Sequence, residues 1–252
     1  MGGRGSNMRA SHGMRTAAQT PGQALVARLR ADPTALLQMT DSEALTAFQE
    51  IDARPIGQGE NDTFVQRYMD AIGWSEAMPT VLSPTAYNQA RQTAGAANMY
   101  HADKDYGGTS GAAFNRQYLT GNRAYSSNGV YGAGTYWAAQ SASSSAGYGN
   151  HQIKGFMNQN ARTVTNKRLR TLVRNFSNSH PRAAAFLSNN RKVGYGGSDE
   201  ILHPIVAAAN GYNIILAHNS VQRSSYIVTL NRSATTVCSQ TNDYARVGMR
   251  NW

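Results

Sequence analysis

Four side chains between residues 101 and 148 have the types and spacing that could hold a flat, polar ligand. His101 ends the segment ANMYH, which has the composition of a short strand. Thirty residues later begins the segment YGAGTYWA, which contains Tyr136, and Ser145 and Tyr148 follow in the segment SAGY. Tyrosine faces can stack on a planar, positively charged ring, and a histidine and a serine can hydrogen-bond polar groups at its edge.

Other common catalytic and cofactor-binding patterns are missing from the sequence. It contains no GxxxxGK[ST], HExxH or GxSxG motif, and the segment GAG at residues 132–134 lacks the third glycine of a dinucleotide-binding turn. No two of the six histidines are four residues apart and Cys238 is the single cysteine, so we expect no metal site and no internal disulfide. A pair of catalytic carboxylates is not expected either, because only five carboxylates follow residue 76: Asp103, Asp105, Asp199, Glu200 and Asp243.

The segments YH, YGAGTYWA and SAGY together resemble the NAD-binding core of the ADP-ribosyltransferases, and most closely the branch of diphtheria toxin and the poly(ADP-ribose) polymerases. In that branch a first strand carries a histidine, a G-x-G-x-Y-[FW]-A strand carries a tyrosine, and an S-A-x-Y turn follows. The resemblance covers residues 97–240, and GYNII and YIVTLNRSA are similar to the last core strands of phage and bacterial members. It implies an α+β fold with a split β-sheet core and a mono-ADP-ribosyltransferase that uses NAD+ as substrate, without a metal.

The resemblance also implies a role for each residue. Tyr136 and Tyr148 stand at the positions that clamp the nicotinamide ring, while the backbone of Ala102 and the side chain of Ser145 would bind its carboxamide. His101 would hydrogen-bond the adenosine-side ribose. Ala102 stands where the family usually has glycine. The reaction is a substitution through an oxocarbenium-like state, so it depends largely on positioning and charge stabilisation. Taken singly, each of these residues also fits a purely structural role.

The sequence departs from the family at one catalytic position. The family's glutamate, which binds the 2′-OH of the nicotinamide ribose and supports nucleophile activation, begins a late strand, and Ser225 stands at the matching position. Glu200 is the only glutamate after residue 76, and its place before an apolar helix also fits ordinary first-turn charge. Three alternatives are open: Glu200 reaches the site from a loop, Gln222 or Ser225 binds the ribose without acting as a base, or the protein binds NAD+ without transfer. We expect the neutral residues to meet the ribose.

The pattern of apolar residues divides the chain into three parts. Residues 1–20 lack periodicity and are predicted to form a disordered leader. Residues 21–95 are predicted to form a helical region, and residues 96–252 an ADP-ribosyltransferase-like catalytic domain of short strands and helices. A capping box is expected at Thr40 and Glu43, and Ser83 is expected to cap a helix. In the last part, strands are expected at 97–101, 129–138, 153–157, 163–165, 212–217, 226–230 and 235–238, and helices at 167–176, 181–187 and 201–209. The clearest strands are 212–217 and 226–230.

The formal charge of +10 is unevenly distributed. Residues 1–76 carry 7 Lys and Arg against 9 Asp and Glu, whereas residues 77–252 carry 17 against 5. This balance fits either an ordinary basic surface or attraction to nucleic acid or another polyanion. Arg168, Arg170 and Arg174 have helical spacing, which fits either a solvated face or a patch that docks a target.

Two functional hypotheses follow from the sequence. The first is an enzyme that modifies a macromolecular acceptor, protein or nucleic acid, as a phage or bacterial effector or toxin. The second is a catalytically silent module that binds nucleic acid or an ADP-ribose-like ligand. The sequence has no apolar run of 18 residues and no secretory signal. We therefore expect a cytoplasmic location, which for a phage effector or toxin would be the cytoplasm of the host cell. A membrane partner is not expected.

Overall fold

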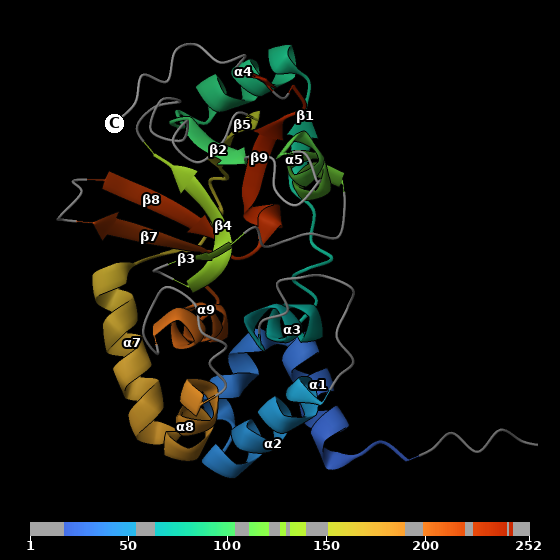
Figure 1. The fold of residues 1–252 in the computed structure, drawn as a ribbon, viewed down its shortest axis with the longest axis vertical. Helices are drawn as coiled ribbons and strands as arrows, with labels where there is room; N and C mark the ends of the chain where they lie inside the picture. The colour runs from blue at the N-terminus through green and yellow to red at the C-terminus, as the bar shows by residue number, and fades with distance from the viewer. Residues whose placement is uncertain are drawn as a thin grey trace, which may run out of the picture.

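The described part of the chain folds into a mixed β-sheet with most of its helices gathered at one end (Figure 1). This arrangement agrees with the predicted α+β class at the level of a mixture of sheet and helices. The structure is a computed structural model, and it describes residues 18–53, 64–103, 111–120, 127–129, 132–139, 151–189, 199–219, 224–240 and 242–243.

Within these residues, eight strands follow one another across the sheet in the order β1-β9-β5-β2-β4-β8-β7-β6, while β10 pairs with β5 and β3 with β4. The pairs β1–β9 and β6–β7 are parallel, and the other neighbours are antiparallel. The strands are β1 (Thr80–Leu82), β2 (Met99–Asp103), β3 (Ser127–Gly129), β4 (Gly132–Ala138), β5 (His151–Met157), β6 (Thr163–Thr165), β7 (Ile214–Asn219), β8 (Ser224–Thr229), β9 (Thr235–Cys238) and β10 (Asn242–Asp243).

Several helices begin or end at capping residues in the sequence. The backbone N–H of Thr40 donates to the Glu43 carboxylate at 2.8 Å, and that of Glu43 donates to the Thr40 hydroxyl at 3.2 Å, so the predicted capping box is confirmed. Ser83 caps the helix that follows it. Gly211 follows the end of α9 (Asp199–Ala209) and has a φ of 72°, a left-handed conformation that favours glycine. The helices are α1 (Pro21–Ala31), η1 (Pro33–Gln38), α2 (Asp41–Asp52), α3 (Phe64–Ala71), α4 (Pro84–Thr93), α5 (Gly111–Thr120), α7 (Asn166–Ser179), α8 (Pro181–Asn189), α9 (Asp199–Ala209) and η2 (Arg232–Ala234).

One hydrophobic core joins the early helices α1–α3 to the late helices α7–α9 and to one face of the sheet. The rings of Phe64 and Phe186, from α3 and α8, meet edge to face at 5.9 Å. The Asp41 carboxylate accepts hydrogen bonds from the backbone N–H groups of Arg182 at 3.1 Å and Ala183 at 3.0 Å, so α2 caps the start of α8. Helices α1–α3 therefore pack directly on a later part of the chain.

Strand β1 lies within the region 21–95 that the sequence predicts as helical. It has only three residues, and it pairs with β9 from Thr80 opposite Thr236 to Leu82 opposite Cys238. This strand is not predicted from the sequence, because three residues give too short a pattern to recognise and their pairing depends on a distant partner. The predicted helical region thus also supplies an edge of the sheet.

The sheet is weakly joined at its centre. β2 pairs with β5 along its whole length, but it pairs with β4 only where Tyr100 lies opposite Ala138. β4 then pairs with β8 from Thr135 to Ala138. The strands β2 and β4 therefore part after Tyr100, at the position of His101.

Candidate functional site

The parting strands β2 and β4 bring together two of the predicted site residues, His101 and Tyr136. Nδ1 of His101 lies 2.6 Å from the main-chain oxygen of Tyr136. Because a carbonyl oxygen can only accept, Nδ1 carries the proton and donates it. In the neutral ring the lone pair is then at Nε2. This bond thus fixes both the orientation and the tautomer of His101.

Strand pairing and aromatic packing explain the position of the His101 ring. A continuous antiparallel ladder would satisfy the Tyr136 carbonyl with a backbone N–H, but β2 has already left β4 at this point. The His101 ring, 6% exposed, lies beside the buried ring of Trp137 at 5.6 Å between centroids. Trp137 in turn meets Tyr118 of α5 edge to face at 5.4 Å. His101 therefore has a structural role in addition to any role in binding.

The side chains of Tyr136 and Trp137 point to opposite faces of β4, as neighbours in a strand must. Trp137 is fully buried in one hydrophobic cluster, while the half-buried ring of Tyr136 packs against the cluster formed with the helices. His101 accordingly contacts the main chain of Tyr136 on one side and the ring of Trp137 on the other.

The structure explains why a glycine, Gly134, stands two residues before Tyr136 in the segment YGAGTYWA. A Cβ at this position would lie 2.6 Å from Cγ1 of Val228 and 3.1 Å from the main-chain oxygen of Thr229. A side chain there would push β8 away from β4. We conclude that Gly134 serves strand packing, because it allows the backbones of β4 and β8 to approach closely.

The other residues of the predicted site are placed only in part. Ala102 lies within β2 opposite Gln152, so its extended backbone accommodates alanine in place of the family's glycine. Ser225 is the second residue of β8 and lies opposite His218 of β7. Its neighbour Tyr226 pairs with Ala138, the residue of β4 that also pairs with β2. Ser225 therefore belongs to the strand that lies next to β4, close in register to the point where β2 and β4 part.

Five residues of the sequence hypothesis have no described side chain: Ser145, Tyr148, Glu200, Gln222 and Ser225. The backbone of Glu200 lies in the first turn of α9, as the apolar helix after it predicts. Ser145, Tyr148 and Gln222 lie outside the described residues. The expected stacking of Tyr136 and Tyr148 on one ligand stays a prediction, as does the choice among Glu200, Gln222 and Ser225.

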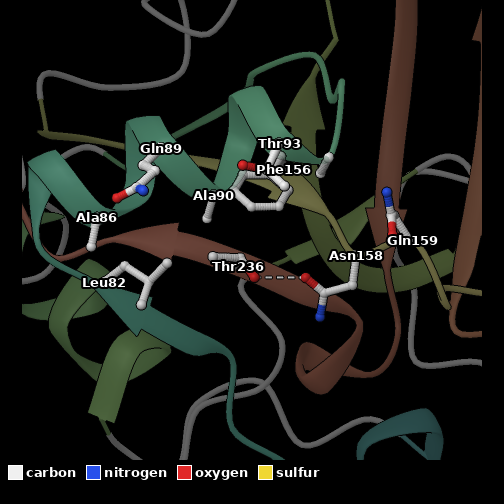
Figure 2. A pocket seen from close by; sticks show the side chains of 10 residues that line it. Leu82, Ala86, Gln89, Ala90, Thr93, Phe156, Asn158, Gln159 and Thr236 are labelled. Carbon is white, nitrogen blue, oxygen red and sulfur yellow. Dashed lines mark hydrogen bonds between the residues drawn. The ribbon is translucent and has the colours of Figure 1, made fainter.

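A pocket of 620 Å³ lies elsewhere, between α4 and the strands β1, β5 and β9 (Figure 2). Inside it the hydroxyl of Thr236 donates to Oδ1 of Asn158 at 2.7 Å. The lining offers amide and hydroxyl groups but no titratable group, so it suits a neutral ligand and supplies no acid or base. No pattern in the sequence predicts this pocket. Its lining residues are Leu82, Ala86, Gln89, Ala90, Thr93, Ala94, Phe156, Asn158, Gln159 and Thr236.

Tyr118, whose ring packs on Trp137 beside the parting strands, is uncharged. Burial raises the pKa of Tyr118 above its ordinary value, and its hydroxyl lies 3.0 Å from that of Thr235, so Tyr118 is neutral at physiological pH. Within the described ranges, no three His, Cys, Asp or Glu side chains come together in a way that could hold a metal ion. The described helices also include none that is long and apolar enough to cross a membrane.

Comparison with known proteins adds little to this geometry. No family model and no curated protein matches the chain. A solved structure titled "Crystal structure of an anti-CRISPR protein" is similar at 10% sequence identity and a TM-score of 0.33, over 56% of this chain and 95% of that chain. A similarity of this strength carries no argument about function.

Proposed function

We propose that the protein is a mono-ADP-ribosyltransferase that transfers ADP-ribose from NAD+ to a macromolecular acceptor. The observation that supports this proposal best is the parting of β2 and β4, where the hydrogen bond from His101 to the Tyr136 carbonyl is made. A sheet that is weakly joined beside the histidine strand is compatible with the split core that the resemblance implies. The motifs that resemble the family thus meet on neighbouring strands, although they are 35 residues apart in the sequence.

The fixed tautomer of His101 gives it a defined binding property. With Nδ1–H committed to the Tyr136 carbonyl, Nε2 is the atom that accepts a hydrogen bond, and a ribose hydroxyl is a suitable donor. A neutral hydroxyl–imidazole hydrogen bond contributes about 1 kcal/mol, or roughly a factor of five to ten in binding. His101 in this proposal orients the adenosine-side ribose and takes no part in proton transfer.

The transfer itself breaks the bond between C1′ of the ribose and the nicotinamide nitrogen. Nicotinamide leaves with the bonding electrons as a neutral molecule, the nucleophile of the acceptor forms the new bond to C1′, and the acceptor's proton goes to solvent or to a basic group. Ser225, at the start of β8, replaces the usual glutamate. A hydroxyl can orient the ribose but cannot accept a proton at neutral pH. We therefore expect slow transfer of a single ADP-ribose per site.

The experiment that tests the proposal separates the two nitrogens of His101. Asparagine places an amide near the position of Nδ1 and nothing at Nε2, so His101→Asn keeps the bond to the Tyr136 carbonyl and loses the ribose contact. His101→Ala loses both. Nicotinamide release from NAD+ is measured with and without cell lysate as a source of acceptor, together with thermal melting of each variant.

We expect His101→Asn to melt within a few degrees of the wild type but to lose about tenfold in kcat/KM. His101→Ala should also lose roughly 1–3 kcal/mol of stability, because the Tyr136 carbonyl is left without its donor. A control is His180→Gln, which alters another buried histidine: its Nε2 lies 2.9 Å from the main-chain oxygen of Met39. Full activity in His101→Asn would show that His101 does not bind the ribose. No nicotinamide release by the wild type in any lysate would overturn the proposal of transfer in favour of a silent binding module.

A further inference from the structure

Helix α7 presents a long polar face to solvent. Its apolar residues Leu169, Val173 and Phe176 are buried against the core, and the exposed residues repeat with helical spacing on the other side. In Figure 1 the helix runs along the outside of the helical end of the molecule. We call its exposed residues the α7 basic face; they are Lys167, Arg168, Arg170, Thr171, Arg174, Asn175, Asn178 and Ser179.

The described side chains form no ion pair on this face. Between Asp105 and Asp199 the sequence has no Asp or Glu but eleven Lys and Arg. Among the described residues the ion pairs are Arg30–Glu76 and Arg67–Asp52, and neither includes a residue of α7. Within this part of the chain, the four cations of the α7 basic face are therefore available to an external anion.

We propose that the α7 basic face binds double-helical DNA through its phosphates. The 14 residues of α7 correspond to about 21 Å of helix, with a diameter of about 10–12 Å. The major groove of B-form DNA is about 12 Å wide and admits such a helix. Lys167, Arg168, Arg170 and Arg174 can neutralise phosphates, while Thr171, Asn175 and Asn178 add hydrogen bonds to phosphate or base edges.

The composition of the face favours DNA over other polyanions. The exposed large hydrophobic residues of the described chain are Leu37, Met78 and Val81, and none is on α7, so the face lacks the apolar anchors typical of a protein interface. It also has no aromatic ring on which the bases of a single strand could stack. The major groove of duplex RNA is deep and narrow and does not admit a helix. Duplex DNA is the polyanion whose charge and groove width fit a basic helix face without apolar or aromatic side chains.

This inference does not depend on the proposed enzymatic activity, and it is tested without NAD+. Fluorescence anisotropy of a labelled 20-base-pair DNA duplex measures the Kd of the whole protein at 50, 100 and 200 mM NaCl. Four phosphate contacts predict a slope of log affinity against log salt of roughly −3.6, which is a loss of about 150-fold between 50 and 200 mM.

Two double variants with equal loss of charge make the comparison specific. Arg168→Gln with Arg174→Gln should weaken binding at 50 mM NaCl by at least tenfold and reduce the slope by about 1.8. The control, Arg28→Gln with Arg116→Gln, removes exposed arginines on α1 and α5 and should leave both quantities nearly unchanged. Thermal melting verifies that both variants fold.

A charge-conserving variant and two competitors complete the test. Arg168→Lys with Arg174→Lys should keep most of the affinity, because a lysine also neutralises a phosphate. Equal weakening by the α7 and control variants, or the absence of DNA binding by the wild type at 50 mM NaCl, would show that the proposal is wrong. Competition by duplex RNA or by poly-glutamate as effective as that by unlabelled DNA would likewise overturn the assignment to DNA.

Discussion

A buried arginine near the end of the sheet allows a sharp prediction of stability. Arg232 of η2 is 1% exposed. Its Nη1 donates to the main-chain oxygen of Tyr118 at 2.8 Å, and its Nη2 donates to that of Ser75 at 2.8 Å. The ring of Tyr118 lies 5.7 Å from the guanidinium carbon. One side chain thus joins the end of α5 and the segment after α3 to the sheet.

The cost of the substitution Arg232→Met follows from these contacts. Hydrogen bonds to a charged group contribute about 1.5–3 kcal/mol each, and buried carbonyls that lose their donors remain unsatisfied. Methionine fills part of the space of the aliphatic stem but donates no hydrogen bond. We therefore expect the free energy of unfolding to fall by about 3–5 kcal/mol.

Urea unfolding followed by circular dichroism measures this change, with Arg30→Met as the matched control. Arg30 forms an ion pair with Glu76 at 2.7 Å, but the two side chains are 48% and 69% exposed. Such a pair contributes about 0–1 kcal/mol, so the control should be close to the wild type. Similar midpoints for the two variants would refute the reasoning, because burial would then make no difference to the arginine.

Two further predictions concern other elements. Asp41→Ala should lower the free energy of unfolding by about 1–2 kcal/mol, because α8 loses the carboxylate that caps its first backbone N–H groups, while Ser42→Ala should have little effect in the same urea titration. Burial raises the pKa of Tyr68, Tyr87 and Tyr118 above the ordinary value of about 10, so these tyrosines ionise first in the unfolded chain. The contribution of these neutral tyrosines to the free energy of unfolding should therefore be fully present below pH 10 and should decrease as the pH rises above 10. Complete ionisation of all tyrosines near pH 10 in the native protein, measured by ultraviolet absorbance, would contradict this account.

Local signals in the sequence predicted much of the secondary structure. The capping box of Thr40 and Glu43 and the cap at Ser83 act within a few residues, so they are visible in a single segment. The apolar spacing of 167–176 predicted most of α7, and Gly211 marked the end of α9. The predicted strand at 97–101 is found at Met99–Asp103, which is a shift of two residues at its edges.

Features that depend on distant parts of the chain could not be predicted in this way. β1 requires β9, and the shared core of α1–α3 with α7–α9 requires contacts between segments more than a hundred residues apart. The sequence suggested a ligand for His101 but not its bond to the Tyr136 carbonyl, because that bond exists only where β2 and β4 part. The sequence alone could therefore suggest which residues form the site. The orientation and tautomer of the His101 ring depend on the pairing of strands in the sheet.

The distance in sequence between α2 and α8 has a consequence for biosynthesis. Asp41 meets the backbone of Arg182, 141 residues later. A ribosome adds about 5–20 residues per second, so α2 waits roughly 7–30 s before α8 has been made. During that interval the side of α2 that later packs on α8 is open to chaperones and proteases, and β1 waits longer still for β9. Assembly of the sheet is therefore largely completed after translation, when the last strands have left the ribosome.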